Sequence, residues 1–136
     1  MSIKFPSDEW IKELCARLNA SETYAHAAAN WEGDIIFIIL PDADYPNTTY
    51  VYINLQHGEA SDARLLSSLD EQKALYTFSS PYSTWRRVLE GRLDVLQGIF
   101  SGKLKLVGNM AQVQRNPKAA YELVKVAAQI DSDFVS

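Results

Sequence analysis

Apolar residues near the amino terminus recur at the spacing of an α-helix. The residues that share one face of the segment "DEWIKELCARLNA" are Trp10, Ile11, Leu14, Cys15 and Leu18, because residues three and four apart lie on the same side of a helix. Ser7 precedes the segment and is a favoured N-cap, since its hydroxyl can accept a hydrogen bond from a free backbone amide. The pattern predicts a helix over residues 8–20 and a second, Ala-rich helix from residue 21.

The pattern then changes to that of β-strands. Residues 34–40, "DIIFIIL", are apolar on both faces, as in a strand that is covered on both sides. Residues 49–56 and 72–79 alternate apolar and polar side chains instead. The polar segment 57–71 predicts a connection, with a short helical turn at 63–67. Three successive strands without a long crossover helix predict an antiparallel meander.

Helices dominate the carboxyl-terminal part of the pattern. The next predicted helix has Ser80 as its cap, Pro81 at its first position and Gly91 at its end. Proline is favoured at the first position of a helix and glycine just after its last turn. The other elements predicted in this part are a short helix within 92–102, a strand at 103–107, a helix at 110–115 after Asn109, and a helix at 117–130 after Asn116.

The segment "SGKLKLVGN", residues 101–109, allows two interpretations. A Gly-Lys pair after an apolar segment suggests a phosphate-binding loop, which requires G-x-x-x-x-G-K-[ST]. Gly98 lies one residue too close to Gly102 for that motif, and Leu104 occupies the position of the required Ser or Thr. The alternation instead predicts a strand in which Leu104 and Leu106 face a core and the two lysines face the solvent.

These elements predict one α+β domain over residues 1–136, with a mostly antiparallel sheet covered by helices. A content of 47% hydrophobic and 22% charged residues is ordinary for a globular protein. The longest apolar run, residues 35–40, is far shorter than the roughly 20 residues needed to cross a bilayer. Cys15 has no partner for an intramolecular disulfide, and no export signal is evident, so a cytoplasmic location is expected.

Charge is distributed unevenly along the chain, whose net charge is -4. Residues 1–81 hold 5 Lys and Arg against 12 Asp and Glu, whereas residues 82–130 hold 8 against 3. The basic part can attract anionic head groups or phosphates, although a solvated helical face is the simpler explanation. The acidic total and the lack of a sustained basic stripe argue against nucleic acid as a partner.

The sequence offers no pattern for a metal site, a cofactor or catalysis. His26 and His57 are the only histidines, and no His-x-x-x-His or Cys-x-x-Cys spacing is present to hold a metal. Asp42 and Asp44 are interpreted as turn residues, since a calcium loop would need a glycine that is absent here. No nucleophile elbow occurs. We therefore expect no cofactor, no metal and no enzymatic activity.

Aromatic residues are plentiful, with 3 Trp, 7 Tyr and 5 Phe. They fall mainly in the predicted strands and in the helices that would cover them, so they either fill a core or surround an apolar cavity, which is the usual form of a small-molecule site. Two other aromatics are Trp31, at the end of the Ala-rich segment, and Tyr45, in the turn segment 41–47. They are expected at the surface and could belong to a contact surface.

A long segment, "YTFSSPYSTWRRVLEGRLDVLQGIFSGKLKLVGN", resembles the sterol carrier protein 2 family. That family typically has here a strand, a helix with an aromatic residue, a Gly, an Asp, and a Gly-Lys-Leu strand that ends on Gly-Asp or Gly-Asn. The residues that match this order are Trp85, Leu89, Gly91, Asp94, Gly102, Lys103, Leu104, Leu106, Gly108 and Asn109. The order of elements agrees over nearly the whole chain, although the first 70 residues agree only in outline.

Two departures from the family pattern are present. Gly98 stands where the family commonly has Ala, which loosens that helix. The ending "DFVS" is not the Ser-Lys-Leu type of peroxisomal address. The second departure suggests a stand-alone relative of the prokaryotic or archaeal type, whose natural lipid need not be a sterol.

The resemblance implies a sheet of about four to five strands and helices that enclose an apolar tunnel. Such a tunnel would hold a fatty acid, a fatty acyl chain, a sterol or a similar lipid without covalent chemistry. The residues expected to line it are Phe37, Ile39, Ile53, Tyr76, Phe78, Trp85, Leu89, Leu96, Phe100, Met110 and Val113. Each of them has ordinary core packing as its alternative.

The resemblance also suggests roles for the last helix and for three basic residues. The helix residues that could form a lid are Ala120, Leu123, Val124 and Ala127. Arg86, Arg87 and Lys118 could meet a lipid head group or a membrane surface. The expected partners are a small lipid ligand and, transiently, a membrane or an enzyme of lipid metabolism.

Two other functions stay open at this point. Domains of this family also serve as accessory or interaction modules of enzymes in lipid or quinone metabolism. A third alternative is a subunit of an enzyme that acts on an acyl or isoprenoid substrate, with catalytic residues supplied by a partner.

Overall fold

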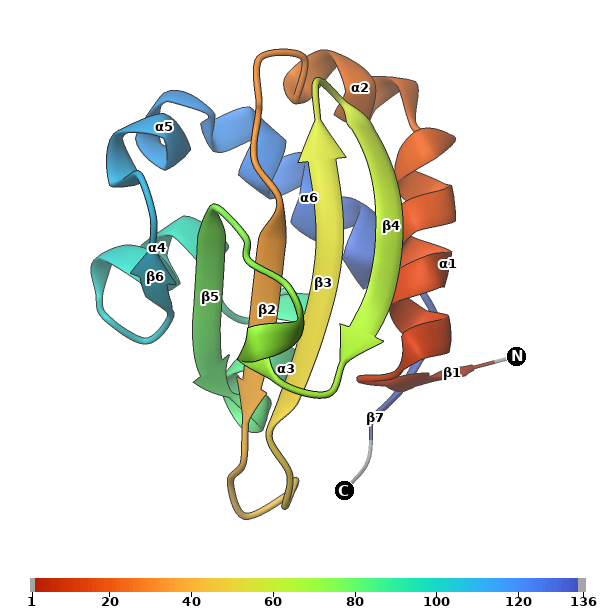
Figure 1. Cartoon of the computed structure of the whole chain (residues 1–136), viewed down its shortest axis with the longest axis vertical. Coiled ribbons are helices and arrows are strands. Elements are labelled where there is room, and N and C mark those ends of the chain that lie inside the picture. The colour runs from red at the N-terminus through yellow and green to blue at the C-terminus, as the bar shows by residue number, and fades with distance from the viewer. Residues whose placement is uncertain (1, 135–136) are drawn as a thin grey trace.

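A five-stranded mixed sheet forms the middle of this α+β fold, with strands in the order β4-β3-β2-β5-β6 (Figure 1). The computed structural model describes residues 2–134, so that Met1 and the last two residues of the "DFVS" ending lie outside the described residues. The strands of the sheet are β2 (Ile35–Leu40), β3 (Thr49–Gln56), β4 (Glu59–Leu66), β5 (Tyr76–Pro81) and β6 (Lys105–Val107).

Helices cover one face of this sheet, with α3 and α6 behind it and α1 beside β4 in Figure 1. The helices are α1 (Asp8–Asn19), α2 (Glu22–Ala27), α3 (Tyr82–Leu89), α4 (Val95–Phe100), α5 (Met110–Arg115) and α6 (Pro117–Ala128). A 3-10 helix, η1 (Leu69–Glu71), lies in the connection that crosses the other face. Within residues 2–134, no helix combines the length and apolar character required to cross a membrane.

The α1 helix forms as its pattern predicts. Ser7 caps it, because the Ser7 hydroxyl oxygen accepts a hydrogen bond from Trp10 N at 3.0 Å. The apolar face of the helix is buried, with Ile11 and Leu18 fully inaccessible. Asp8 accepts a hydrogen bond from Leu65 N at 3.0 Å, which fixes the start of α1 to β4.

Strand β2 is covered on both faces, as its continuous apolar run predicts. Ile35 and Ile39 belong to the main core beneath the helices. Ile36 faces the opposite side and packs with Tyr52 and Leu66 in a smaller cluster. Ala74, from the connection between β4 and β5, packs against this second cluster, so the connection covers the face that lacks helices.

Strand β4 replaces the polar connection predicted for residues 57–71, and that prediction, with its helical turn at 63–67, is wrong. The strand lies at the sheet edge, where outward side chains are polar and the inward residues Ala60 and Ala63 are small. Small residues are required there because α1 packs closely on β4, and Asn19 of α1 bonds both the N and the O of Ala60 at 2.8 Å. The apolar alternation that signals a strand is therefore weak.

The predicted antiparallel meander of three strands is also wrong. Strands β2 and β3 are antiparallel, but β5 pairs with β2 in parallel, with Phe37 opposite Phe78. The missed strand β4 is the cause, because it reverses the chain once more before the connection crosses the sheet to β5. Strand β6 then pairs antiparallel with β5, so the sheet is mixed.

The start of α3 differs from the predicted cap. Pro81 is the N-cap residue and the helix begins at Tyr82, whereas Ser80 still belongs to β5. The buried Ser80 hydroxyl donates to Lys103 O at 2.7 Å and is thus not available to the helix. Asp42 performs the capping instead, since its Oδ2 accepts from Ser83 N at 2.7 Å.

The α4 helix explains the departure at Gly98. A Cβ at Gly98 would lie 2.8 Å from Cδ1 of Leu104, so the missing side chain makes room for this leucine, which is 1% exposed. Leu106 is half-buried and Lys103 and Lys105 are exposed, which confirms the predicted alternation.

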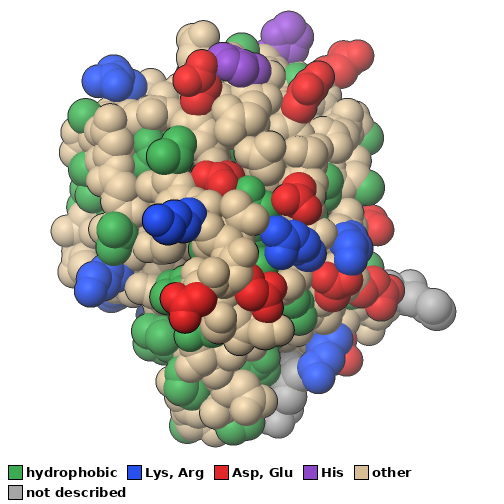
Figure 2. Space-filling view, viewed as in Figure 1, with side chains coloured by type: hydrophobic (Ala, Val, Ile, Leu, Met, Phe, Trp, Pro, Cys, Tyr) green, Lys and Arg blue, Asp and Glu red, His purple; other side chains and the backbone are tan. Residues whose placement is uncertain are grey.

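The ends of the described chain form a separate two-stranded parallel sheet. Strand β1 (Ile3–Phe5) pairs with β7 (Ser132–Phe134), and Trp10 Nε1 donates to Ser132 Oγ at 2.8 Å. Figure 2 views the face crossed by the β4–β5 connection, where acidic and basic side chains are interspersed. The larger apolar space lies under the other face.

The pH dependence of stability offers a test of the Asp42 contact. The hydrogen bond from Ser83 N holds the pKa of Asp42 below its usual value of 3.8. A lowered carboxyl pKa contributes stability that is complete above the ordinary pKa and is lost as the pH falls through the lowered one. In acid titrations followed by circular dichroism, Asp42→Asn should therefore lose stability less steeply below about pH 4 than the unchanged protein. An Asp44→Asn variant with the same shallow profile would contradict a role for the Ser83 contact.

Candidate functional site

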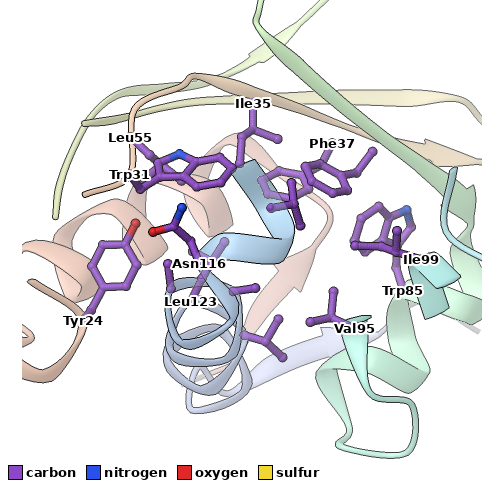
Figure 3. Close-up of a pocket in the computed structure, with 15 residues that line it drawn as sticks. Tyr24, Trp31, Ile35, Phe37, Leu55, Trp85, Val95, Ile99, Asn116 and Leu123 are labelled. Carbon is purple, nitrogen blue, oxygen red and sulfur yellow. The ribbon is translucent and has the colours of Figure 1, made fainter. Parts of the chain in front are cut away.

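An apolar cavity of about 80 Å³ lies between the helix-covered face of the sheet and α6 (Figure 3). The residues around it are Tyr24, Trp31, Ile35, Phe37, Leu55, Phe78, Trp85, Val95, Ile99, Val113, Asn116, Ala119, Ala120, Leu123 and Val124. Strands, α2, α3, α4, α5 and α6 all contribute to this set, so the cavity forms only when the whole fold is assembled.

A second apolar cavity, of about 60 Å³, adjoins the first further along α6. Its lining consists of Phe5, Trp10, Leu14, Phe37, Ile39, Val51, Trp85, Val88, Leu89, Leu123, Val124 and Ala127. Four side chains line both cavities, namely Phe37, Trp85, Leu123 and Val124. We call these four residues the partition, because they are the side chains that stand between the two spaces.

Aromatic packing holds the sheet side of the partition. The rings of Phe37 and Phe78 stack with centroids 6.0 Å apart, and the Trp85 ring meets Phe37 edge-on at 5.6 Å. Trp85 Nε1 donates to Ile38 O at 3.0 Å, which satisfies the only polar atom of this side chain. The helix side of the partition, Leu123 and Val124, is half-buried and has no such directional contact.

A shallower hollow of about 420 Å³ continues from the second cavity to the ends of α3 and α6. It shares Leu89 and Ala127 with that cavity and also includes Glu90, Gly91 and Phe134. The three spaces therefore follow α6 in order, from Asn116 at its beginning to Ala128 at its end.

The first cavity has polar groups at one end only. Tyr24 is 2% exposed, and burial raises the pKa of its hydroxyl to about 12. Asn116 projects its carboxamide into the same region in Figure 3, and its Nδ2 donates to Gln112 O at 2.8 Å. The other polar atoms of the lining side chains are the indole N–H groups of Trp31 and Trp85, which donate to Gly33 O at 2.9 Å and to Ile38 O at 3.0 Å and are thus satisfied.

The structure brings part of the predicted lining together. Phe37, Ile39, Phe78, Trp85, Leu89 and Val113 line one or both cavities. Ile53, Tyr76 and Leu96 are buried in the surrounding core, and Met110 is packed against it. Phe100 is 58% exposed at the end of α4, because Leu96 and Ile99 occupy the inner side of this short helix. All four residues suggested for a lid lie on α6 and line a cavity.

Sequence reasoning missed Tyr24, Asn116 and Trp31 as cavity residues. Trp31 and Tyr45 were expected at the surface, but they are 7% and 9% exposed, which corrects that prediction. Trp31 packs on Tyr76 with ring centroids 4.9 Å apart, and Tyr45 stacks on Tyr82. Both aromatics lie next to turns and are buried by contacts with residues far away in the sequence. The polarity of the neighbouring residues does not reveal such contacts.

Reactive side chains lie away from the cavities. Cys15 is half-buried on α1, where burial raises the pKa of its thiol. His57 lies in the β3–β4 hairpin, with its Nε2 2.9 Å from Glu32 Oε1, and is largely exposed. Across residues 2–134 there is no group of three or more His, Cys, Asp or Glu that could hold a metal ion. The site is thus built for apolar contact.

Comparisons with known proteins agree with this architecture. Residues 11–120 match the family described as the SCP-2 sterol transfer family. A crystal structure of sterol carrier protein 2 is 35% identical over 93% of this chain and 99% of its own, with a TM-score of 0.85. No curated protein matches the sequence at a significant level.

Two further structures are similar to this chain. A conserved hypothetical protein of Thermus thermophilus, described as possibly sterol carrier protein, is 34% identical over 98% of this chain and 94% of its own, with a TM-score of 0.86. The inverting sec-alkylsulfatase Pisa1 of Pseudomonas sp. is 19% identical over 93% of this chain but only 16% of its own, with a TM-score of 0.54, which is a likeness of fold alone.

Proposed function

The chain belongs to the SCP-2 sterol transfer family, and we propose on this premise that it binds a lipid-like apolar molecule and carries it without chemical change. A lipid-binding or transfer role is the common element of the family description and of the sterol carrier structure that resembles the chain. The proposal goes further by placing the ligand in the space beneath α6.

The observation that best supports this placement is the pair of cavities that share the partition. Their linings are apolar apart from the Tyr24 and Asn116 end, so water gains little by entering them. An apolar chain bound there would be removed from water, and it has no polar group that would be left without a hydrogen bond. Transfer of each methylene out of water contributes about 0.8 kcal/mol, which makes binding favourable without any catalytic group.

Ligand entry requires the partition to move. An apolar cavity of roughly 150 Å³ accommodates benzene, whereas the two cavities here measure about 80 and 60 Å³, so neither holds a longer chain as it stands. Leu123 and Val124 are the side chains suited to move, because they are half-buried and lie on a helix. Their displacement would join the two cavities and free the volume that these two side chains now fill, which gives one tunnel along α6.

The hollow at the ends of α3 and α6 is the proposed entrance. It adjoins the second cavity through Leu89 and Ala127, and it is bordered by Phe134 of β7. Arg86 lies over the Phe134 ring at 5.0 Å and bonds Glu90 at 3.2 Å. A basic side chain at this border can meet an anionic membrane surface, and Arg87, beside it in the last turn of α3, adds to the attraction. Lys118 lies at the other end of α6, so it is not part of this border.

An accessory role in an enzyme of lipid metabolism is the second candidate. The fold likeness to Pisa1, which covers only 16% of that chain, favours this alternative, because there the fold is one part of a larger protein. A stable partner in a pull-down with the immobilised chain, together with no ligand uptake, would support this function over the first.

Native mass spectrometry tests the proposed function directly. The purified chain is incubated with vesicles of phosphatidylcholine that contain a total lipid extract, separated from them, and measured under non-denaturing conditions. We expect a complex with one apolar molecule per chain, released by organic extraction. A chain that stays free of ligand, and that does not accelerate lipid exchange between donor and acceptor vesicles, would contradict the proposal.

A further inference from the structure

The hydroxyl of Tyr24 has no protein partner at the polar end of the first cavity. The side chain is 2% exposed, and among residues 2–134 the structure contains no hydrogen bond to this hydroxyl. No fully enclosed side-chain N or O of the described residues lacks a partner, so the Tyr24 oxygen borders open space. Its hydrogen bond is therefore made to whatever fills that space, either water or a polar group of a bound molecule. Its pKa of about 12, like the ordinary tyrosine value of 10.0, lies far above neutral pH, so the phenol is protonated and able to donate.

Asn116 provides an acceptor beside this donor. Its Nδ2 donates to Gln112 O at 2.8 Å, and this contact fixes which end of the carboxamide is oxygen. Although Asn116 is the N-cap residue of α6, its side chain bonds none of the helix amides. Its Oδ1 has no protein partner within the described residues, and Figure 3 places the carboxamide in the same part of the cavity as the Tyr24 hydroxyl.

The lining does not favour a charged ligand group. Neither cavity includes a Lys, Arg or His side chain among the described residues. A carboxylate buried here would lose its hydration without gaining an opposite charge, which is costly. A neutral hydroxyl suits the pair better, because its oxygen can accept from Tyr24 while its hydrogen is donated to Asn116.

We propose that Tyr24 and Asn116 bind the uncharged hydroxyl group of an otherwise apolar ligand, so that the protein selects lipid alcohols over free fatty acids. This inference rests on the proposed lipid-binding function and adds the orientation and the chemical class of the ligand. The hydroxyl group lies at the Tyr24 end, and the apolar body extends past the partition towards the second cavity.

The test uses three probes with the same chain length, which are decan-1-ol, decanoate and 1-chlorodecane. Binding at about pH 7 is measured by native mass spectrometry and by competition titration for the unchanged protein and for Tyr24→Phe. We expect decan-1-ol to bind at least about 10-fold more tightly than decanoate, because the carboxylate is buried without a counter-charge. Tyr24→Phe should lower the affinity for decan-1-ol by about 3- to 10-fold, which is the usual range for one lost hydrogen bond. It should change the affinity for 1-chlorodecane by less than about 2-fold.

Tyr52→Phe is the matched control. It removes a tyrosine hydroxyl that bonds Asp34 at 2.8 Å on the opposite face of the sheet, so it should alter none of the three affinities. Tyr24→Phe should also keep the melting temperature of the ligand-free protein, because the hydroxyl that it removes has no partner. A clear fall in that temperature would reveal a protein partner and overturn the inference.

Different binding results would overturn the lipid-binding function and the preference for alcohols. If the unchanged protein binds none of the probes, both the proposed function and this inference are wrong. If it binds all three probes but holds decanoate as tightly as decan-1-ol, only the inference is wrong. The same holds if Tyr24→Phe changes the affinities for decan-1-ol and 1-chlorodecane by the same factor.

Discussion

Replacement of Leu123 with Trp is expected to lower the affinity for a long-chain apolar ligand by about 100-fold. Leu123 lines both cavities from α6, and an indole at this position would fill the space through which they join. A ligand restricted to one cavity would lose the burial of about four methylenes, and at about 0.8 kcal/mol each this corresponds to roughly 3 kcal/mol. Titration with decan-1-ol or 1-chlorodecane measures the effect.

A tryptophan on the outer side of the same helix is the control. Tyr121 is 43% exposed on α6 and lines neither cavity, so Tyr121→Trp should bind as the unchanged protein does. Circular dichroism must show that Leu123→Trp is folded, since its added volume has to fit the present free space. Unaltered affinity of folded Leu123→Trp would mean that the ligand does not pass the partition.

Replacement of Trp85 with Ala is expected to have the largest effect on stability. Trp85 is 7% exposed, separates the two cavities, meets Phe37 edge-on and donates to Ile38 O. Loss of such a side chain typically costs about 3–5 kcal/mol, because the space that it leaves is only partly refilled. The free energy of unfolding of the ligand-free protein should fall by this amount in urea titrations.

Ligand should restore part of the stability lost in Trp85→Ala, because the joined cavities can then be filled by the ligand itself. The shift of the melting temperature on addition of decan-1-ol should therefore be larger for Trp85→Ala than for the unchanged protein. Trp85→Phe keeps an aromatic ring beside Phe37 and should lose much less, about 1–2 kcal/mol. A loss below about 1 kcal/mol in Trp85→Ala would contradict the packing described for the partition.

The elements with strong local signals were predictable from the sequence. The α1 helix has a cap and a clear apolar face. The alternating lysines and leucines of residues 103–106 indicate a strand at 103–107, of which β6 forms the part from Lys105 to Val107. Asn116 and Pro117 mark the start of α6 correctly. In each case neighbouring residues determine the structure, so no knowledge of distant contacts is needed.

The elements that depend on distant contacts were not predictable. Strand β4 has alanines on its inner face because α1 lies close to it, and the bonded residues Asn19 and Ala60 are 41 positions apart in the sequence. The residues next to Ser80 predict that it caps α3, although its hydroxyl donates to the distant Lys103 O instead. The parallel pairing of β5 with β2 was not predictable either, because it depends on the presence of β4.

The sequence indicated which residues share the inner layer of the fold, but not which of them line a cavity. Successive side chains of a strand point to opposite faces, so Phe37 and Ile39 share one face of β2, and both line a cavity. Ile53 faces the same layer on β3, yet it is 0% exposed within the solid core. Tyr24 carries no signal in the sequence beyond being a large side chain in an Ala-rich helix, since its importance arises from a missing hydrogen-bond partner.

The tryptophans allow the most direct test of the central claim, that an apolar ligand occupies the space beneath α6. All three tryptophans of the chain line this space, with Trp31 at the first cavity, Trp10 at the second and Trp85 at both. Titration with 1-bromodecane should quench their fluorescence, because bromine quenches an indole that it contacts, and the effect should saturate at one ligand per chain. Bound 1-bromodecane that leaves the tryptophan emission unchanged would place the ligand elsewhere and contradict the account.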